Sequence, residues 1–394
     1  MSNVKLLYVG IGGYGVTNLD RFLSGELEGC EIAGVVDVKP ETTWFYNRLV
    51  EMGTKIYHSL DEFYAENTAD LAIISTPIQF HAPQSIYCMK HGSNVICEKP
   101  VASTVEEALE MKKVSEETGR FIDVGYQASY SLATLNFKAD VAAGVFGKPL
   151  SAKTLCLWPR TEKYYGRSAW AGKLQGPNGE WILDSVANNA TAHYLHNMFY
   201  VLGGADNCSL TPGKIEFELY RGNPIESFDT CALRAEAAGV PVLFLVSHTV
   251  DEHLGPVIEF RFEKATVTVG GGEDGDDIVA VLSDGTKKNY GSMQLGRAEK
   301  LQRAIDMCRW KAVMVCGIDA ALPQALVIRE FHRDPAFIHD VKSKIQVKEY
   351  ETEGLLHYYP GMAADLRKCF DEGKLPSEIG CEWAVAPVVT TVKV

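Results

Sequence analysis

A glycine-rich segment near the start of the chain offers the clearest chemistry. Gly10-Ile11-Gly12-Gly13-Tyr14-Gly15 fits the pattern G-x-G-x-x-G between an apolar run and an expected helix, the context in which this pattern binds a pyrophosphate. The first glycine makes the tight turn, the second admits the phosphates, and the third lets helix and strand pack closely. Amides at the helix N-terminus then face the negative charge. The segment predicts a dinucleotide site; the alternative is a glycine-rich turn without a ligand.

Asp37 indicates which dinucleotide is expected. It ends the next apolar run, 22 residues after Gly15, where a carboxylate can hydrogen-bond a ribose 2′-hydroxyl and repels a 2′-phosphate. NAD is therefore expected rather than NADP. Lys39 weakens this preference, because a basic side chain nearby can partly accommodate the phosphate.

Two further segments stand at the ends of later apolar runs. They are Ser75-Thr76-Pro77, which is followed by His81, and Cys97-Glu98-Lys99-Pro100. Ligands of open parallel sheets bind at the carboxyl ends of the strands, so both segments are expected to lie beside the dinucleotide. The ammonium of Lys99 can hydrogen-bond an oxygen that becomes negatively charged during a reaction. The alternative for Lys99 is a surface lysine at a turn.

An aromatic and basic segment, residues 158–181, offers groups suited to sugars. Its tryptophan and tyrosine rings provide faces for stacking, and its cations provide donors to hydroxyl or carboxylate groups. The alternative is a surface excursion or part of an oligomer contact. The residues predicted to contact substrate are Arg160, Tyr164, Arg167 and Trp170, with Trp158, Tyr165, Lys173 and Trp181 nearby.

The elements that would position these groups fall into two halves. Up to about residue 126, short apolar runs alternate with helical patterns, which is typical of βαβ units and a parallel sheet. Ser59 with Glu62 and Ser103 with Glu106 fit the S-x-x-E capping box of helix starts, and Gly119 is placed to end the second helix. The expected strands are Lys5–Gly10, Glu31–Val36, Ala69–Ser75, Asn94–Glu98 and Phe121–Gly125.

The second half begins with helical patterns and continues with strand-like runs joined by short turns, which predict an antiparallel sheet. The predicted fold is an N-terminal α/β Rossmann domain, a doubly wound parallel sheet over residues 1–126. A C-terminal α+β domain with a large, mainly antiparallel open sheet is expected over residues 127–394. The expected helices are Ala133–Phe146 and Ala190–Leu202, and the expected strands are Lys214–Tyr220, Cys231–Ala235, Val242–His248, Ile258–Phe262 and Ala265–Val269.

Composition narrows the class of partner. The chain has 394 residues, with 38 basic against 51 acidic side chains and a net charge of −13, which disfavours nucleic acid and an anionic membrane surface. Its ten cysteines form no C-x-x-C pair, so neither a zinc site nor a disulfide scaffold is indicated. No secretory signal pattern and no run of about 18 apolar residues are found, and a cytoplasmic protein is expected.

The strand ending in Glu98-Lys99-Pro100 after a G-x-G-x-x-G domain resembles the Gfo/Idh/MocA family of sugar and cyclitol oxidoreductases, over essentially the whole chain. The resemblance implies that Lys99 lies beside the nicotinamide and the substrate hydroxyl. It also implies that Tyr126 and Gln127, after the last strand of the first domain, line the cleft near the nicotinamide.

The family also carries a helix with the pattern D-x-G-x-H and a second acid three residues later. Counting back from Gly203, which is expected to end this helix, places the family's aspartate at Asn189, its histidine at His193 and its second acid at His196. Here the chain departs from the pattern: Asn189 stands where the family has an aspartate. An amide cannot accept a proton at neutral pH. The resemblance then implies His193 as the general base, with Asn188, Asn189 and His196 contacting substrate. A register starting at Asp184 instead places Asn188 at the histidine position.

His193 and His196 stand three residues apart on one helical face, which permits a shared metal. No carboxylate stands at a neighbouring turn, and the family is largely metal-free, so no metal is predicted. The alternative for either histidine is a buried structural role.

These observations predict an NAD-dependent dehydrogenase that transfers hydride between nicotinamide and a ring hydroxyl of a sugar, cyclitol or glycoside. One alternative is a lyase or glycosidase in which tightly bound NAD is transiently reduced. A second is a non-catalytic sensor that binds NAD. The resemblance also implies a homo-dimer or homo-tetramer that associates through the exposed face of the antiparallel sheet.

Overall fold

The chain folds into two compact units. The computed structural model describes residues 2–204, 207–270, 275–350 and 352–394. The first unit comprises Met1–Ser131 and Gln294–Leu322, and the second comprises Leu132–Met293 and Pro323–Val394. The sequence pattern placed the boundary at residue 126 and assigned the segment 294–322 to the second half. In the structure this later segment packs as part of the first unit.

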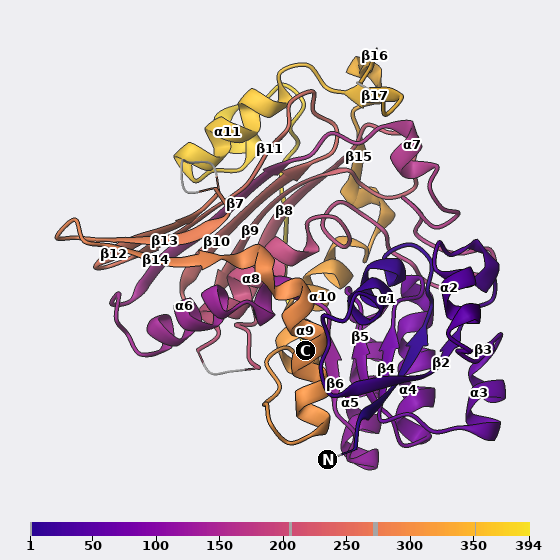
Figure 1. The fold of residues 1–394 in the computed structure, drawn as a ribbon. Coiled ribbons are helices and arrows are strands. Elements are labelled where there is room, and N and C mark those ends of the chain that lie inside the picture. Colours follow the sequence, from indigo (N-terminus) through magenta and orange to yellow (C-terminus); the bar gives the residue numbers. More distant parts are fainter. Residues whose placement is uncertain (1, 205–206, 271–274, 351) are drawn as a thin grey trace. The chain divides into compact units, whose positions relative to one another are not determined.

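The first unit contains a six-stranded parallel sheet in the order β3-β2-β1-β4-β5-β6 (Figure 1). The expected Rossmann sheet is therefore confirmed, with every predicted strand present to within two residues at its ends and β3 as an addition. The order turns back at β1 and β4, and at such a switch point a crevice opens at the carboxyl ends of the strands. The strands are β1 (Val4–Val9), β2 (Cys30–Val36), β3 (Ile56–Tyr57), β4 (Leu71–Ile74), β5 (Asn94–Cys97) and β6 (Ile122–Val124).

The core of this unit explains why its strands read as continuous apolar runs. All four residues of β4 are buried, as expected of a central parallel strand covered on both faces. The last helix of the unit adds Leu301, Ala304 and Ile305, at helical spacing, to the apolar cluster that includes Leu6 and Ile73. The helices are α1 (Gly15–Leu23), α2 (Tyr46–Glu51), α3 (Leu60–Glu66), α4 (His81–Lys90), α5 (Val105–Thr118) and α9 (Gly296–Cys308).

Local signals set the helix ends, with one correction. The side chain of Ser59 accepts a hydrogen bond from the amide of Glu62 and caps α3, as predicted. The capping box predicted from Ser103 and Glu106 is wrong by one residue: Thr104 and Glu107 form it. Ser103 and Thr104 are adjacent hydroxyl residues, and either side chain can cap a helix. Gly119 ends α5 with φ of 64°, as expected of a left-handed C-cap.

The second unit contains a ten-stranded mixed sheet in which most neighbours are antiparallel, which confirms the predicted class. Strand β7 was not predicted from the sequence; it lies between β10, its parallel neighbour, and β11, its antiparallel neighbour. The strands are β7 (Pro149–Leu157), β8 (Lys214–Arg221), β9 (Thr230–Ala237), β10 (Val240–Ser247), β11 (Leu254–Phe262), β12 (Ala265–Val269), β13 (Asp277–Leu282), β14 (Lys287–Ser292), β15 (Ile338–Asp340) and β18 (Val388–Thr391). A separate hairpin pairs β16 (Gln346–Glu349) with β17 (Leu355–Tyr358).

Helices pack against both faces of this sheet. From β7, Thr154 contacts Met198 on one face, whereas the ammonium of Lys153 donates to the carbonyl of Phe370 on the other. The helices are α6 (Leu132–Ala142), which ends four residues before its predicted end, α7 (Glu162–Tyr165), α8 (Ala192–Leu202), α10 (Ile318–Phe331), which crosses the boundary between the units, and α11 (Met362–Glu372).

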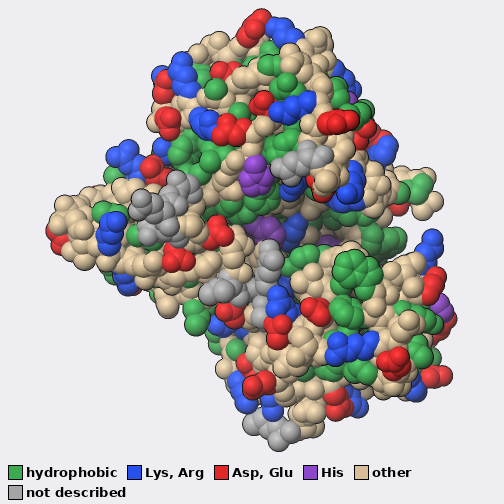
Figure 2. Space-filling model, turned by 45° about the horizontal axis from the view of Figure 1, so that its top comes forward, with side chains coloured by type: hydrophobic (Ala, Val, Ile, Leu, Met, Phe, Trp, Pro, Cys, Tyr) green, Lys and Arg blue, Asp and Glu red, His purple; other side chains and the backbone are tan. Residues whose placement is uncertain are grey.

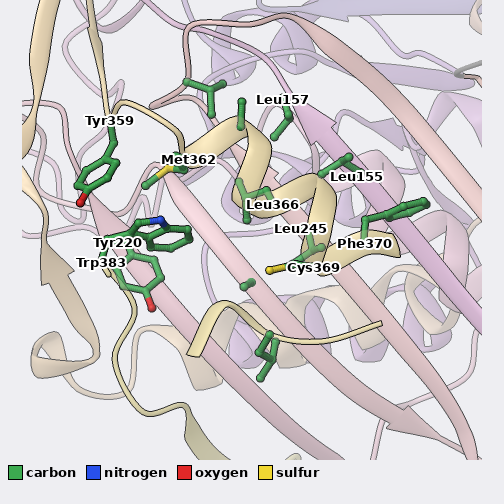
Figure 3. Close-up of a cluster of buried hydrophobic side chains, with 14 of the residues drawn as sticks. Leu155, Leu157, Tyr220, Leu245, Tyr359, Met362, Leu366, Cys369, Phe370 and Trp383 are labelled. Carbon is green, nitrogen blue, oxygen red and sulfur yellow. The ribbon is translucent and has the colours of Figure 1, made fainter. Parts of the chain in front are cut away.

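Helix α11 covers part of the sheet face that was expected to be exposed. Met362, Leu366 and Phe370, on one side of the helix, pack with Leu155 and Leu245 of the sheet (Figure 3). The sheet residues under α11 are therefore buried within the chain itself. A homo-dimer or homo-tetramer stays a prediction.

Surface charge is mixed. On the face drawn in Figure 2, lysine and arginine side chains are interspersed with aspartate and glutamate. Among the residues that the structure describes, no helix is long and apolar enough to span a bilayer.

Candidate active site

The residues predicted to bind the dinucleotide all lie in the first unit, each just beyond the carboxyl end of a strand. Because the strands are parallel, these ends share one edge of the sheet, and the structure therefore brings the predicted groups together. Gly10–Gly15 follow β1, Asp37 follows β2, Ser75–Pro77 follow β4, Glu98–Pro100 follow β5, and Tyr126 and Gln127 follow β6.

The glycine-rich loop has the backbone that phosphate binding requires. Gly10 has φ of 79°, and a Cβ there would lie 2.7 Å from Thr76 Cγ2. A Cβ on Gly15 would lie 2.1 Å from the carbonyl oxygen of Gly10, so only glycine lets α1 begin this close to β1. At Gly12 no atom lies within 4 Å of a Cβ position, which leaves open space above the amides that precede α1. The loop therefore fits the pyrophosphate of a dinucleotide.

Asp37 is fixed against this loop. One carboxylate oxygen accepts from the amide of Ile11 at 2.8 Å, and the other accepts from the amide of Lys39 at 2.8 Å. Each carboxylate oxygen can accept more than one hydrogen bond, so acceptor capacity remains for a ribose hydroxyl. Lys39 thus contributes its backbone to holding the carboxylate in place.

His81 joins the turns that follow β4 and β5. It is 1% exposed, and its two ring nitrogens lie 2.8 Å from the carbonyl oxygen of Pro100 and 2.9 Å from that of Thr76. Burial lowers its pKa. A neutral ring has one N–H and donates to one of these carbonyls. His81, which the sequence assigned to the cofactor, lies against protein carbonyls on both sides. Lys99 is half-buried in the same turn, next to the cis peptide bond that it forms with Pro100.

Glu98 and Ser75, both predicted from the sequence, lie in one polar network with Lys300 and Asn18, which were not predicted. The ammonium of Lys300, on α9, forms an ion pair with Glu98 Oε1. Asn18 of α1 donates to the same oxygen at 3.0 Å and to Ser75 Oγ at 2.9 Å. Nothing in the local pattern marks Lys300 as part of the site, because it stands 202 residues from Glu98.

Tyr14 and Gln127 form a second link across this edge. The hydroxyl of Tyr14, in the glycine-rich loop, donates to Gln127 Oε1 at 2.9 Å. The ammonium of Lys300 lies 5.0 Å from the centre of the Tyr14 ring, within the range of a cation–π contact. Tyr126, next to Gln127, is fully buried.

The aromatic segment of the second unit packs its rings and guanidinium groups against one another. The guanidinium of Arg160 lies 4.8 Å from the ring centre of Tyr164, and that of Arg167 lies 3.7 Å from it. Arg167 also lies 5.0 Å from the ring centre of Trp170. The four side chains of this segment that were predicted to contact substrate thus form one stacked group. The stacking restricts their conformations.

Asn189, before α8, contacts Asp184, the acid of the alternative register. Asn189 donates to Asp184 Oδ1 at 2.8 Å, and the amide of Gly172 donates to Asp184 Oδ2 at 2.6 Å. The buried carboxylate of Asp184 therefore holds the side chain of Asn189 in place. Asn188 is buried and donates to the carbonyl of Leu183 at 3.0 Å, so its amide supports the backbone of this turn.

The two histidines of α8 differ in environment. His193 is half-buried at the start of the helix, whereas His196, one turn later, is 1% exposed and stacks on Tyr200. Burial lowers the pKa of His196 to about 3, and the nearby Lys138 acts in the same direction. His196 is therefore neutral and packed in the core of its unit. Within the described part of the chain, no cluster of three histidine, cysteine or carboxylate side chains suits a metal ion.

Comparison with known proteins connects the first unit to a protein family. A family model described as an oxidoreductase family with an NAD-binding Rossmann fold matches residues 4–126. The chain is 28% identical over 156 residues to an inositol 2-dehydrogenase of Mycolicibacterium smegmatis, covering 38% of this chain and 43% of that protein. It is 27% identical over 185 residues to an α-N-acetylgalactosaminidase of Shewanella oneidensis, covering 43% of this chain and 39% of that protein. The match thus spans less than half the length of each of these two relatives.

A solved structure extends the likeness to the second unit. The WlbA dehydrogenase of Bordetella pertussis, in complex with NADH and UDP-GlcNAcA, superposes with a TM-score of 0.69 and 20% sequence identity. The superposition covers 85% of this chain and 97% of that one. At this identity the likeness establishes the fold alone.

Proposed function

Since residues 4–126 belong to the Gfo/Idh/MocA oxidoreductase family, we propose that this protein is an NAD-dependent dehydrogenase acting on a ring hydroxyl of a sugar, cyclitol or glycoside. One observation carries the proposal: a single sheet edge gathers the glycine-rich loop, Asp37 and Lys99. The loop offers amides to phosphates, the carboxylate offers acceptors to a ribose, and the ammonium offers a donor to a reacting oxygen.

Each residue has a separate part in the reaction. The glycine-rich loop and Asp37 would hold the dinucleotide, whose nicotinamide would supply the capacity to exchange a hydride with the ring carbon. His193 takes the proton of the substrate hydroxyl as general base. Lys99 donates a hydrogen bond to the same oxygen and stabilises the negative charge that develops there. The aromatic segment 158–181 stacks against the sugar.

The test of this proposal separates chemistry from cofactor binding. Lys99→Ala should lower turnover roughly a hundredfold or more, because one donor to the developing charge is lost. The dissociation constant of the Lys99→Ala variant for NAD should change little. Lys90→Ala, an exposed lysine on α4, is the matched control. Turnover is measured as reduction of NAD with a panel of cyclitols, sugars and glycosides, and binding by calorimetry.

Equal losses in turnover and binding would contradict the role of Lys99. Failure of the whole panel to reduce NAD would favour the non-catalytic sensor instead.

A glycosidase with transient oxidation is the second candidate, favoured by the similarity to the α-N-acetylgalactosaminidase. The same residues would serve, but tightly bound NAD would be restored within each turnover. Hydrolysis of chromogenic glycosides without net formation of NADH identifies this activity. Net NADH formation with a free sugar excludes it as the main reaction.

A further inference from the structure

Lys300 is a buried cation at the edge of the sheet that holds the candidate site. Its side chain is 1% exposed, and that of its partner Glu98 is 12% exposed. A buried ammonium is tolerated only when an opposite charge or several acceptors compensate the loss of hydration. Here one carboxylate oxygen of Glu98 accepts from both the ammonium of Lys300 and the side-chain amide of Asn18. These contacts hold the ion pair in place.

The same ammonium also lies against the glycine-rich loop. It is 5.0 Å from the ring centre of Tyr14, whose hydroxyl donates to Gln127. Lys300 therefore contacts two groups that matter for a dinucleotide: the loop that faces the phosphates, and the acid next to Lys99. It reaches them from α9, a helix contributed by a distant part of the chain.

Charge explains why such a residue is needed there. A dinucleotide brings two negatively charged phosphates to the loop, where helix amides favour an anion. An uncompensated Glu98 carboxylate at the same edge of the sheet would repel them. With Lys300 present, the pair is neutral overall and the carboxylate is fixed in position.

We propose that Lys300 is a positioning residue of the dinucleotide site, which neutralises Glu98 and holds it beside the glycine-rich loop so that the loop can receive an anionic cofactor. The inference rests on the proposed function, because it assumes that the loop binds a dinucleotide.

Lys300 and Lys99 are two cations close to Glu98. Lys300 faces it from α9, and Lys99 is its neighbour in sequence. The neighbouring side chains of His81 and Cys97 are both buried. Without Lys300, the largely buried carboxylate would therefore lose its ion-pair partner.

The experiment measures NAD affinity by calorimetry. Lys300→Met should weaken NAD binding about tenfold or more, because it leaves the largely buried Glu98 carboxylate without its ion-pair partner. Lys300→Arg, which keeps the charge, should rescue binding. Lys112→Met is the matched control, because it breaks an exposed ion pair, Lys112 with Asp319, in the same unit.

The double variant Glu98→Gln, Lys300→Met replaces the ion pair by a neutral pair and tests the idea even if the single variant does not fold. The NAD affinity of the double variant should lie within about threefold of that of the wild type. A tenfold loss in the double variant, or a Lys300→Met variant with wild-type affinity, would overturn the inference. A wild-type protein that binds no NAD contradicts the proposed function itself.

Discussion

We expect Asp123 to make the stability of the protein depend on pH. It lies in the centre of β6 and is fully buried, and its Oδ1 accepts from the amide of Cys316 at 3.2 Å. Burial raises the pKa of this carboxyl to about 7, although neighbouring hydrogen bonds act in the opposite direction. The perturbation is Asp123→Asn, which keeps an acceptor for the Cys316 amide and removes the ionisation.

The magnitude follows from the difference between the folded and unfolded states. A free aspartate titrates near 3.9, about three pKa units lower, and each unit corresponds to about 1.4 kcal/mol, which gives about 4 kcal/mol. Between about pH 4 and pH 7 the unfolded chain has lost this proton and the folded chain retains it, so the wild-type protein loses stability as the pH rises. Above about pH 7 both states are ionised and the difference is constant.

The assay is urea unfolding of the wild type and Asp123→Asn across this range, with Asp20→Asn, an exposed aspartate of α1, as the control. The variant should gain about 4 kcal/mol relative to the wild type between pH 4 and pH 7.5, and the control should gain nothing. A stability difference that is the same at every pH would refute the reasoning, because it would mean that folding does not change the pKa of Asp123.

Two further predictions concern the cofactor and the core. Asp37→Ala should weaken NAD binding about tenfold and NADP binding less, since the carboxylate contacts the loop amide of Ile11 and offers acceptors to the ribose; calorimetry with both nucleotides checks this, and equal losses would count against it. Leu366→Ala should lower the free energy of unfolding by about 2–5 kcal/mol, because the side chain is fully buried in the cluster between α11 and the sheet. Urea unfolding measures the effect, and the same loss in Lys368→Ala, on the exposed side of α11, would disprove the attribution to packing.

The sequence alone predicted those features of this protein that depend on residues close together in the chain. The glycine spacing, the acid after the second strand and the apolar alternation predicted the Rossmann sheet and the groups at its carboxyl edge. The apolar runs marked the buried strands, and the predicted strands of this sheet were correct to within two residues at their ends. The same reasoning failed by one residue at Thr104, where two adjacent hydroxyl side chains could both cap a helix.

Only the tertiary structure decided which distant groups meet. Lys300 pairs with Glu98 across 202 residues, and the apolar side of α9 packs into the first unit although its neighbours in sequence belong to the second. The side chain of Asn189 meets the carboxylate of Asp184 through a contact that depends on how the turn before α8 folds. Such contacts leave no local signal, because they arise when buried charge and apolar surface find partners during packing, and those partners can stand anywhere in the chain.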